Sequence, residues 1–296
     1  MSLLSTRIEA SCCRHFTETL DAPSAPWVES YYKGLLTPFG LDLDTRQLKE
    51  GKNNDFMTMA FAVMQALMVD SPLDDVGLFL MAHQTLDTYF PFRSTTTRLC
   101  RQFGIEAPAV ALTEHELTSP YVALKVLLTA LKQETFVGSG LLLVLDQATQ
   151  PYKGTWDPAQ SIDTALAIKL AKTLGDDGVC VSGHYYWTEK AHKASWIVQC
   201  IYSCLDARRC DMADVHIVAE QAVAQDIGME VKTAQLSITD PRFMSCGGLM
   251  AAVALLNSGT ERVLLVHLST DGHLYLFMFQ QTNGQAGSVD RITCSI

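Results

Sequence analysis

The sequence predicts an α/β fold made of two related halves, and two observations carry this prediction. Between residues 74 and 148, apolar strands alternate with helices, an order that requires crossover connections and a parallel sheet. The helix and strand of 120–148 then find a counterpart in 247–270, where a second buried helix again leads into an apolar strand. An internal repeat of this size indicates a duplicated unit.

The individual elements follow from their apolar patterns. The run 56–69 is apolar all round, which indicates a buried helix. The segment 24–55 contains scattered prolines and glycines, so we expect a loop with short helical turns. Strands are predicted at 7–16, 76–82, 107–112, 140–148, 163–172, 178–187, 215–222 and 262–270. Further helices are predicted in a stretch ending near Phe103 and at 121–134, 194–207 and 247–259.

The boundary between the halves falls in the segment 172–178, which includes a polar, glycine-bounded stretch typical of a hairpin turn. We therefore expect residues 1–173 to form the first half and residues 174–296 the second. No proline-rich or highly charged linker lies between them, so one compact body is expected rather than two independent domains.

The composition excludes several classes of function. Hydrophobic residues make up 48% of the chain and charged residues 18%, which excludes a disordered protein. The net charge of −10 argues against nucleic acid or an anionic membrane as the main partner. No apolar run reaches the length of a membrane span. Arg93, Arg98 and Arg101 form the one obvious basic cluster, which we interpret as a solvated helix face.

The nine cysteines, in a chain without a recognisable signal peptide, indicate free thiols in a reducing cytoplasm. Cys200, Cys204 and Cys210 could suggest a metal site, but Cys200 and Cys204 share one apolar helix face and are better explained as buried thiols. We expect no metal. The Gly-Ser-Gly at 138–140 precedes a strand rather than a helix, which is the wrong context for a phosphate loop, and no cofactor is predicted.

A series of segments covers most of the chain from about residue 55 onward: DDVGLFLMAHQT, Phe90-Pro91, TRLCRQFGI, APAVALTEHELTSPYVALKVLLTAL, DTALAIKL, DVHIVAEQA and FMSCGGLMAAVALL. In this order and spacing they resemble the thiolase fold, and within it the ketosynthase III (FabH-like) condensing enzymes. The resemblance implies a layered α-β-α-β-α body with mixed sheets. It also implies subunits that pair so that their central sheets run together.

Condensing enzymes of this kind use three groups. A cysteine at a helix N-terminus accepts the acyl group, because the helix dipole and backbone N–H groups stabilise its thiolate. A histidine and an asparagine stabilise the thioester oxygen as it gains negative charge. The resemblance places the cysteine position at Glu116 or Leu117, the histidine at Ala219 or Glu220, and the asparagine at Met244. None of these carries the required side chain, so we expect no catalytic set of the family's type.

Three other residues are weak candidates for chemistry. Cys246 lies near the start of the second buried helix, where a thiol could be activated, although a buried, unreactive thiol is the commoner case. Glu116 could act as a base or cap its helix as an anion, and His115 beside it could take part in acid–base chemistry or be polar surface. No triad is predicted around the remaining candidates His184, His267 and His273.

The retained architecture without its reactive groups predicts a non-catalytic subunit that pairs with an active FabH-like ketosynthase in specialised-metabolite biosynthesis. Within the group, the chain most resembles the small inactive subunit of the heterodimeric ketosynthase that forms alkylquinolones. Phe90, Pro91 and Phe92 stand where the resemblance places a loop that reaches the partner's acyl pocket, and 107–118 would complete the interface. The pair would be a heterodimer or heterotetramer, and acyl carrier protein or acyl-CoA would reach it through the partner.

Two alternatives remain open from the sequence. The chain could be a divergent enzyme of the same fold, a decarboxylase, hydrolase or acyltransferase that acts on an acyl thioester through His115, Glu116 or Cys246. It could also be a stand-alone homodimer that binds an acyl or aromatic ligand without chemistry.

Overall fold

The computed structural model describes residues 5–18, 26–43, 54–84, 87, 94–113, 116–149, 161–173, 178–187, 194–228, 230–231, 234–282 and 294–295. Its strands are β1 (Ser5–Phe16), β2 (Val76–Ala82), β3 (Ala109–Leu112), β4 (Ser139–Asp146), β5 (Asp163–Thr173), β6 (Gly178–Trp187), β7 (His216–Ala219), β8 (Gln235–Ile238), β9 (Arg262–Leu268), β10 (His273–Thr282) and β11 (Cys294–Ser295). Its α-helices are α1 (Pro26–Leu36), α3 (Phe56–Asp70), α4 (Thr95–Phe103), α5 (Ser119–Leu131), α6 (Ala194–Arg208), α7 (Gln221–Gly228) and α8 (Gly247–Asn257). Short 3₁₀ turns are η1 (Thr37–Phe39), η2 (Glu116–Thr118), η3 (Met212–Asp214) and η4 (Pro241–Cys246).

The strand order repeats itself. The sheet runs β3-β2-β4-β5-β1-β6-β10-β9-β7-β8, so the first five strands, read from the edge inward, correspond to β8-β7-β9-β10-β6 read from the other edge. In each half the three outer strands are parallel and the two inner strands are antiparallel. The halves join where β1 pairs with β6 over the short stretch from Thr6 to Ile8. The predicted duplication is therefore present in the strand order itself.

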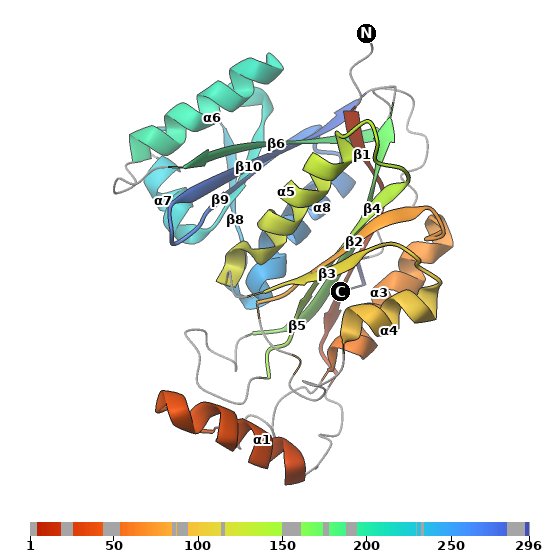
Figure 1. The fold of residues 1–296 in the computed structure, drawn as a ribbon. Coiled ribbons are helices and arrows are strands. Elements are labelled where there is room, and N and C mark those ends of the chain that lie inside the picture. Colours follow the sequence, from red (N-terminus) through yellow and green to blue (C-terminus); the bar gives the residue numbers. More distant parts are fainter. Residues whose placement is uncertain are drawn as a thin grey trace.

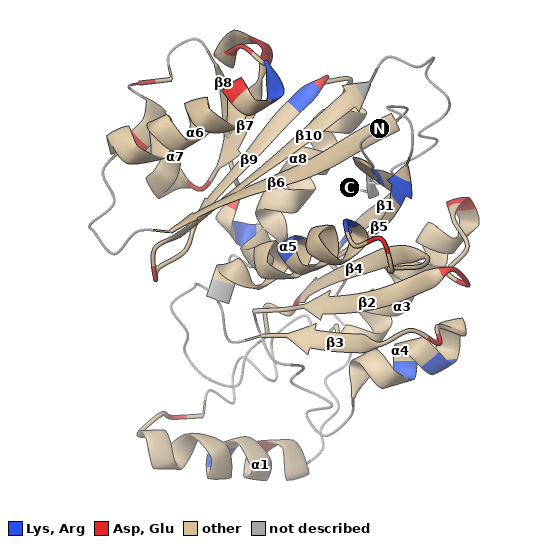
Figure 2. Ribbon diagram, turned by 45° about the horizontal axis from the view of Figure 1, so that its top comes forward, with Lys and Arg blue, Asp and Glu red and all other residues tan. Residues whose placement is uncertain are grey.

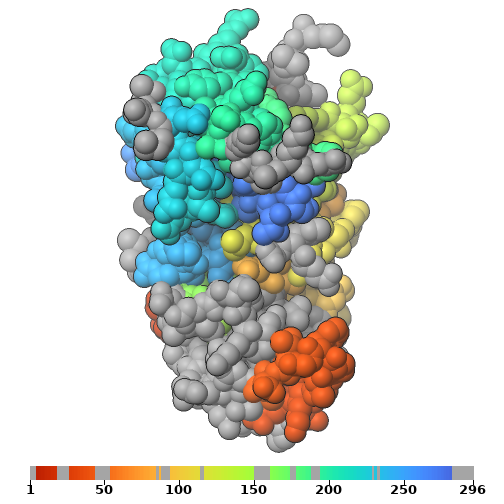
Figure 3. Space-filling model, turned by 90° about the vertical axis from the view of Figure 1, so that its left-hand side faces the viewer, coloured from red at the N-terminus to blue at the C-terminus, as the bar shows by residue number. Residues whose placement is uncertain are grey.

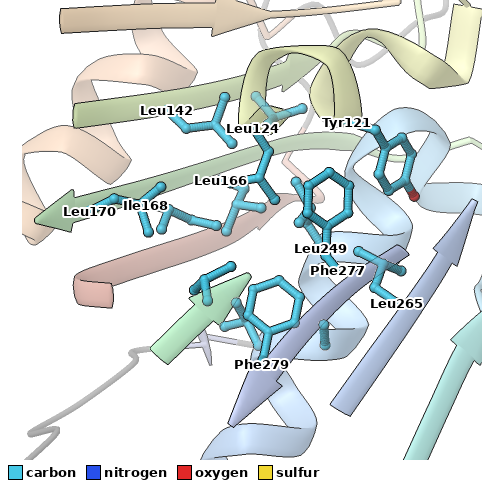
Figure 4. Close-up of a cluster of buried hydrophobic side chains, with 14 of the residues drawn as sticks. Tyr121, Leu124, Leu142, Leu166, Ile168, Leu170, Leu249, Leu265, Phe277 and Phe279 are labelled. Carbon is cyan, nitrogen blue, oxygen red and sulfur yellow. The ribbon is translucent and has the colours of Figure 1, made fainter. Parts of the chain in front are cut away.

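Helices separate and cover the two halves of the sheet. α5 and α8 lie side by side in the middle, α3 and α4 cover the outer face of the first half, and α6 and α7 cover that of the second (Figure 1). The layers are thus α-β-α-β-α, as predicted. In the central layer, leucines of α5, β4 and β5 face Phe277 and Phe279 of β10 (Figure 4). This burial on both sides explains why α5 and α8 are almost uniformly apolar.

The first correction to the sequence prediction concerns the segment 24–55, which contains a helix of eleven residues, α1. Val28, Tyr32 and Leu36 recur every four residues and form its buried stripe. Pro26 stands at the start of the helix, where its missing N–H costs nothing, and so it begins the helix instead of breaking one. α1 lies on the surface at one end of the molecule (Figures 1 and 3).

The second correction concerns the strand predicted at 215–222. β7 ends at Ala219, and α7 begins at Gln221. The prediction failed because Ala219, Gln221 and Ala222 are compatible with either element, and the change from strand to helix is set by packing.

The helix predicted as apolar all round, α3, exposes Met68 and Val69 and is buried on one face. The hairpin turn predicted between β5 and β6 lies outside the described residues.

Charged residues are scattered over the surface rather than gathered on one face (Figure 2). Arg98 and Arg101 are exposed on α4, as their interpretation as a solvated face expected, whereas Arg93 lies outside the described part of the chain. Cys200, Cys204 and Cys210 are buried in the apolar cluster of the second half, and within the described ranges no three potential metal ligands come together. None of the described helices combines the length and apolar character needed to cross a membrane.

The central layer makes a direct prediction about stability. Leu124 of α5 is fully buried between the sheets, whereas Val126 on the same helix is 41% exposed. Leu124→Ala should lower the free energy of unfolding by about 2–5 kcal/mol, because it removes apolar contacts and leaves a cavity. Val126→Ala, the matched control, should change it by less than about 0.5 kcal/mol. Urea unfolding of both variants measures the difference, and equal midpoints would contradict the assignment of the central layer.

Candidate functional site

Polar side chains gather where the parallel strands of both halves end. The carboxyl ends of strands such as β4 and β9 face the turns η2 and η4, which precede α5 and α8 and touch each other. In open α/β sheets, this edge is where ligands bind. The surrounding layers are apolar, so the few polar groups found here stand out.

Three of these side chains form a continuous hydrogen-bonded relay. The hydroxyl of Thr118 lies 2.9 Å from Nε2 of His267, and Nδ1 of His267 lies 2.5 Å from Oε1 of Glu220. A carboxylate can only accept, so Nδ1 carries a proton, and in the neutral imidazole Nε2 is then left to accept the proton of the Thr118 hydroxyl. His267 is 1% exposed, Thr118 8% and the side chain of Glu220 29%, so the relay is most deeply buried at its imidazole and reaches the surface at Glu220. We refer to these three residues as the relay.

The relay corrects the prediction that His267 lacks partners suited to a triad. Its carboxylate partner is 47 positions away in the sequence and its hydroxyl partner 149. No local pattern could reveal either. The available signal was different: His267 is a polar residue that follows the apolar run 263–266 near the end of β9.

Tyr121 holds the imidazole of His267 in place. Their rings stack with centroids 4.0 Å apart and planes inclined by 8°. Burial raises the pKa of Tyr121 well above its ordinary value, and the nearby Glu220 and Cys246 add to the effect, so the phenol stays neutral. A side chain at Gly248 would collide with this phenol, since a Cβ there would lie 2.2 Å from its oxygen. The glycine is therefore what allows Tyr121 to reach its stacked position.

Asp146 is the second buried polar group at this edge. One carboxylate oxygen accepts the backbone N–H of Gln84 at 3.0 Å, and the other accepts from Ser245 N, Ser245 Oγ and Cys246 N at 2.8, 2.5 and 3.3 Å. Burial raises the pKa of Asp146 to about 6, while these hydrogen bonds oppose the shift. The carboxyl thereby ties β4 to the segment after β2 and to the turn before α8.

Asp146 and His267 occupy corresponding positions in the two halves. Side chains alternate along a strand, and Val144 of β4 and Leu265 of β9 both face the central layer. Asp146 and His267 each follow two residues later and face the same way. Asp146 of the first half binds the turn before α8 in the second, and His267 of the second half binds the turn before α5 in the first. The halves are thus joined by two reciprocal contacts.

The same architecture occurs in solved structures. The acyltransferase ChlB3 matches with a TM-score of 0.67 and 13% identity, over 94% of this chain and 98% of that one. The 3-oxoacyl-[acyl-carrier-protein] synthase III of Aquifex aeolicus matches with a TM-score of 0.66 and 10% identity, over 93% and 99%. A single-site variant of OleA of Xanthomonas campestris matches with a TM-score of 0.63 and 10% identity, over 95% and 100%. The chain has a thiolase-like fold. No family model and no curated protein sequence matches it.

The two residues that the resemblance offered for the histidine position face different ways. Ala219 faces the outer layer of α6 and α7, whereas Glu220 reaches the site and binds His267. Leu117, one of the two residues proposed for the cysteine position, is half-buried in η2 next to Thr118. Met244 is 8% exposed and has a φ of 43° and a ψ of −128°, a strained backbone for a non-glycine residue. Glu220 is thus part of the relay, and Leu117 is the neighbour of Thr118 in the chain.

Cys246, the one weak candidate thiol, is unsuited to nucleophilic chemistry. Its side chain is fully buried. Burial raises its pKa well above the ordinary value, and the neighbouring Asp146 raises it further, so the thiolate is disfavoured. The side chain of Glu116, the whole of His115 and the residues predicted to lie at a dimer interface, Phe90, Pro91 and Phe92, are outside the described part of the chain.

The raised pKa of Asp146 leads to a prediction about pH. The ordinary value is 3.8 and the folded value about 6, so between these the folded state binds the proton and the unfolded state does not. The contribution of the Asp146 carboxyl to the free energy of unfolding must therefore fall as the pH rises from about 4 to about 6, by about 3 kcal/mol in total. Asp146→Asn cannot titrate and should lose this dependence.

The measurement is urea unfolding of wild type and Asp146→Asn at several pH values between 4 and 7. The difference in unfolding free energy should change across the window in favour of the variant. Asp70→Asn, at the exposed end of α3, serves as the control and should follow the wild type. A constant difference between wild type and Asp146→Asn would contradict the raised pKa.

Gly248 provides a test of the stacked pair. Gly248→Ala should force Tyr121 away from His267 and lower the free energy of unfolding by about 1–3 kcal/mol. Gly34→Ala is the matched control: Gly34 is also helical, but a Cβ there meets nothing within 4 Å, so this change should stabilise by about 0.5–1 kcal/mol. Thermal unfolding of both variants gives the comparison, and opposite signs are expected.

Proposed function

We propose that this protein pairs with an active FabH-like ketosynthase and is itself non-catalytic in condensation. The observation that carries the proposal is the edge strand β3. It is the last strand of its half, and β2 is its one neighbour among the described residues. Its sequence, Ala-Val-Ala-Leu, is entirely apolar, and Val110 is 46% exposed. An exposed apolar edge offers unpaired backbone groups to another strand, so it is a surface that a partner would cover.

The opposite edge of the sheet differs. β8 reads Gln-Leu-Ser-Ile, and its Gln235 and Ser237 are both bound by the imidazole of His216. Polar side chains are one of the means by which edge strands avoid unwanted pairing. The contrast supports β3 as the pairing edge, which agrees with the expectation for 107–118.

The replaced residues support the non-catalytic part of the proposal. The resemblance places the condensing enzymes' histidine at Ala219 or Glu220 and their asparagine at Met244. None of these residues carries the required side chain, and Cys246 is buried. The partner would therefore supply the thiol and the acyl pocket, and acyl carrier protein or acyl-CoA would reach the complex through it. The free, unbridged thiols of Cys200, Cys204 and Cys246 fit a reducing cytoplasm, where we place the pair.

Co-expression tests the pairing. The full chain is produced with each FabH-like ketosynthase of the same organism, and the mixture is analysed by size-exclusion chromatography with light scattering. One of them should co-elute with this chain in a single species. Val110→Lys should separate the two, because it places a charge on the pairing edge. Val69→Lys is the control, since Val69 is 83% exposed on α3, a helix that covers a face of the sheet rather than its edge.

Separate elution with every ketosynthase would contradict the proposal, as would a stable homodimer of this chain that Val110→Lys does not affect. Equal effects of the two lysine variants would show that solubility, rather than the edge of the sheet, governs the complex.

A further inference from the structure

The relay has the geometry of a catalytic triad that the sequence did not suggest. We propose that Thr118, His267 and Glu220 form an acyl-transfer site, in which the Thr118 hydroxyl attacks the carbonyl of a short-chain activated ester or thioester. This activity goes beyond the proposed pairing and needs none of the residues of a condensing enzyme.

The contacts assign one role to each side chain. Glu220 accepts Nδ1–H of His267 at 2.5 Å and thereby fixes the tautomer. Nε2 then faces the Thr118 hydroxyl at 2.9 Å with a lone pair, ready to take its proton. A nucleophile, a base and an orienting carboxylate in this order are what acyl transfer requires, and such sets recur on unrelated folds. Tyr121 stacks on the imidazole and keeps it from rotating.

If His267 only held the fold together, we would expect its ring to bind backbone groups, as the carboxyl group of Asp146 does. Asp146, which occupies the corresponding position in the first half, binds backbone N–H groups directly and so fixes the turn before α8. The two ring nitrogens of His267 contact side chains instead. Thr118 is also the N-cap residue of α5, yet its side chain makes no capping hydrogen bond. Its backbone is helical at this point, with a φ of −82° and a ψ of −20°, and its hydroxyl is directed to His267.

The surroundings define the substrate. Thr118 retains 8% exposure while Ser119 beside it has none, so little room is left for a substrate beside Thr118. This favours a short acyl chain. The site lies at the N-terminus of α5, and the positive end of the helix dipole favours the oxyanion that forms when the carbonyl is attacked. An activated ester or thioester suits the relay because its alcohol or thiol is a better leaving group than the amine of an amide.

The chemistry balances within the relay. The bond from Thr118 Oγ to the acyl carbon forms as the bond from that carbon to the leaving group breaks, and His267 passes the threonine proton to the departing alcohol or thiol. Water then attacks the acyl-threonine, His267 takes its proton, and the proton returns to Thr118 Oγ. The products are a carboxylic acid and an alcohol or thiol.

The test uses the purified full chain and p-nitrophenyl acetate. Wild type should release p-nitrophenol catalytically and carry one acetyl group on the peptide containing Thr118, as seen by mass spectrometry after rapid quenching. Thr118→Val, which keeps the shape but removes the hydroxyl, should lower kcat/KM at least about 100-fold. Glu220→Gln should lower kcat by a larger factor than the factor by which it raises KM. Thr129→Val is the control, since Thr129 is exposed on α5 and bonds only its own helix, and it should retain activity.

Thr118→Ser separates chemistry from packing, because it keeps the nucleophile and loses the methyl group; it should remain acetylated and active even if Thr118→Val folds poorly. A wild-type rate equal to the buffer blank would overturn the proposal. So would acetylation at another residue, or full activity in Thr118→Val. The assay uses this chain without any ketosynthase, so that a failure of pairing and a failure of the relay can be told apart.

Discussion

The contact on which the architecture depends is the buried carboxyl group of Asp146. It closes β4 and accepts backbone and hydroxyl donors from Ser245 and Cys246, which belong to the other half of the molecule. A carboxyl group in a fully buried position is unfavourable unless its oxygens are satisfied, so the turn before α8 cannot move without exposing an uncompensated polar group. The two halves share few strand pairs across β1 and β6, and this contact adds a polar constraint to the apolar packing of α5 and α8.

The reciprocal contact, from His267 to Thr118, has a different chemical character. Duplication placed a polar residue at the same point of β9, where it reaches the turn before α5. There it meets a hydroxyl rather than backbone N–H groups, and it is bound on its other side by Glu220. The contact of Asp146 thus ties the two halves together through backbone groups. The contact of His267 instead joins a hydroxyl, an imidazole and a carboxylate in one hydrogen-bonded series. Tyr121 stacks on the imidazole and restricts its rotation, and it can do so because Gly248 has no side chain to collide with it.

The relay and the edge strand are neighbours in the chain, although the functions we propose for them are separate. β3 leads through a short segment into η2 and α5, so a protein bound along β3 would lie close to the turn that carries Thr118. The exposed apolar edge makes pairing physically reasonable, and the side chains of Leu117, Glu220 and Met244 support leaving condensation to a partner.

The sequence by itself determined the layered α/β class, the duplication and the positions of the buried helices, because each depends on the local period of apolar residues or on repetition along the chain. It failed at α1, where flanking prolines concealed the stripe of Val28, Tyr32 and Leu36, and at the end of β7, where local propensity is neutral. Tertiary structure alone decided that Glu220 faces the site while Ala219 faces outward, and that His267 has partners 47 and 149 positions away. Hydrogen bonds between distant segments leave no periodic trace in the sequence, since they depend on how strands are ordered in the sheet.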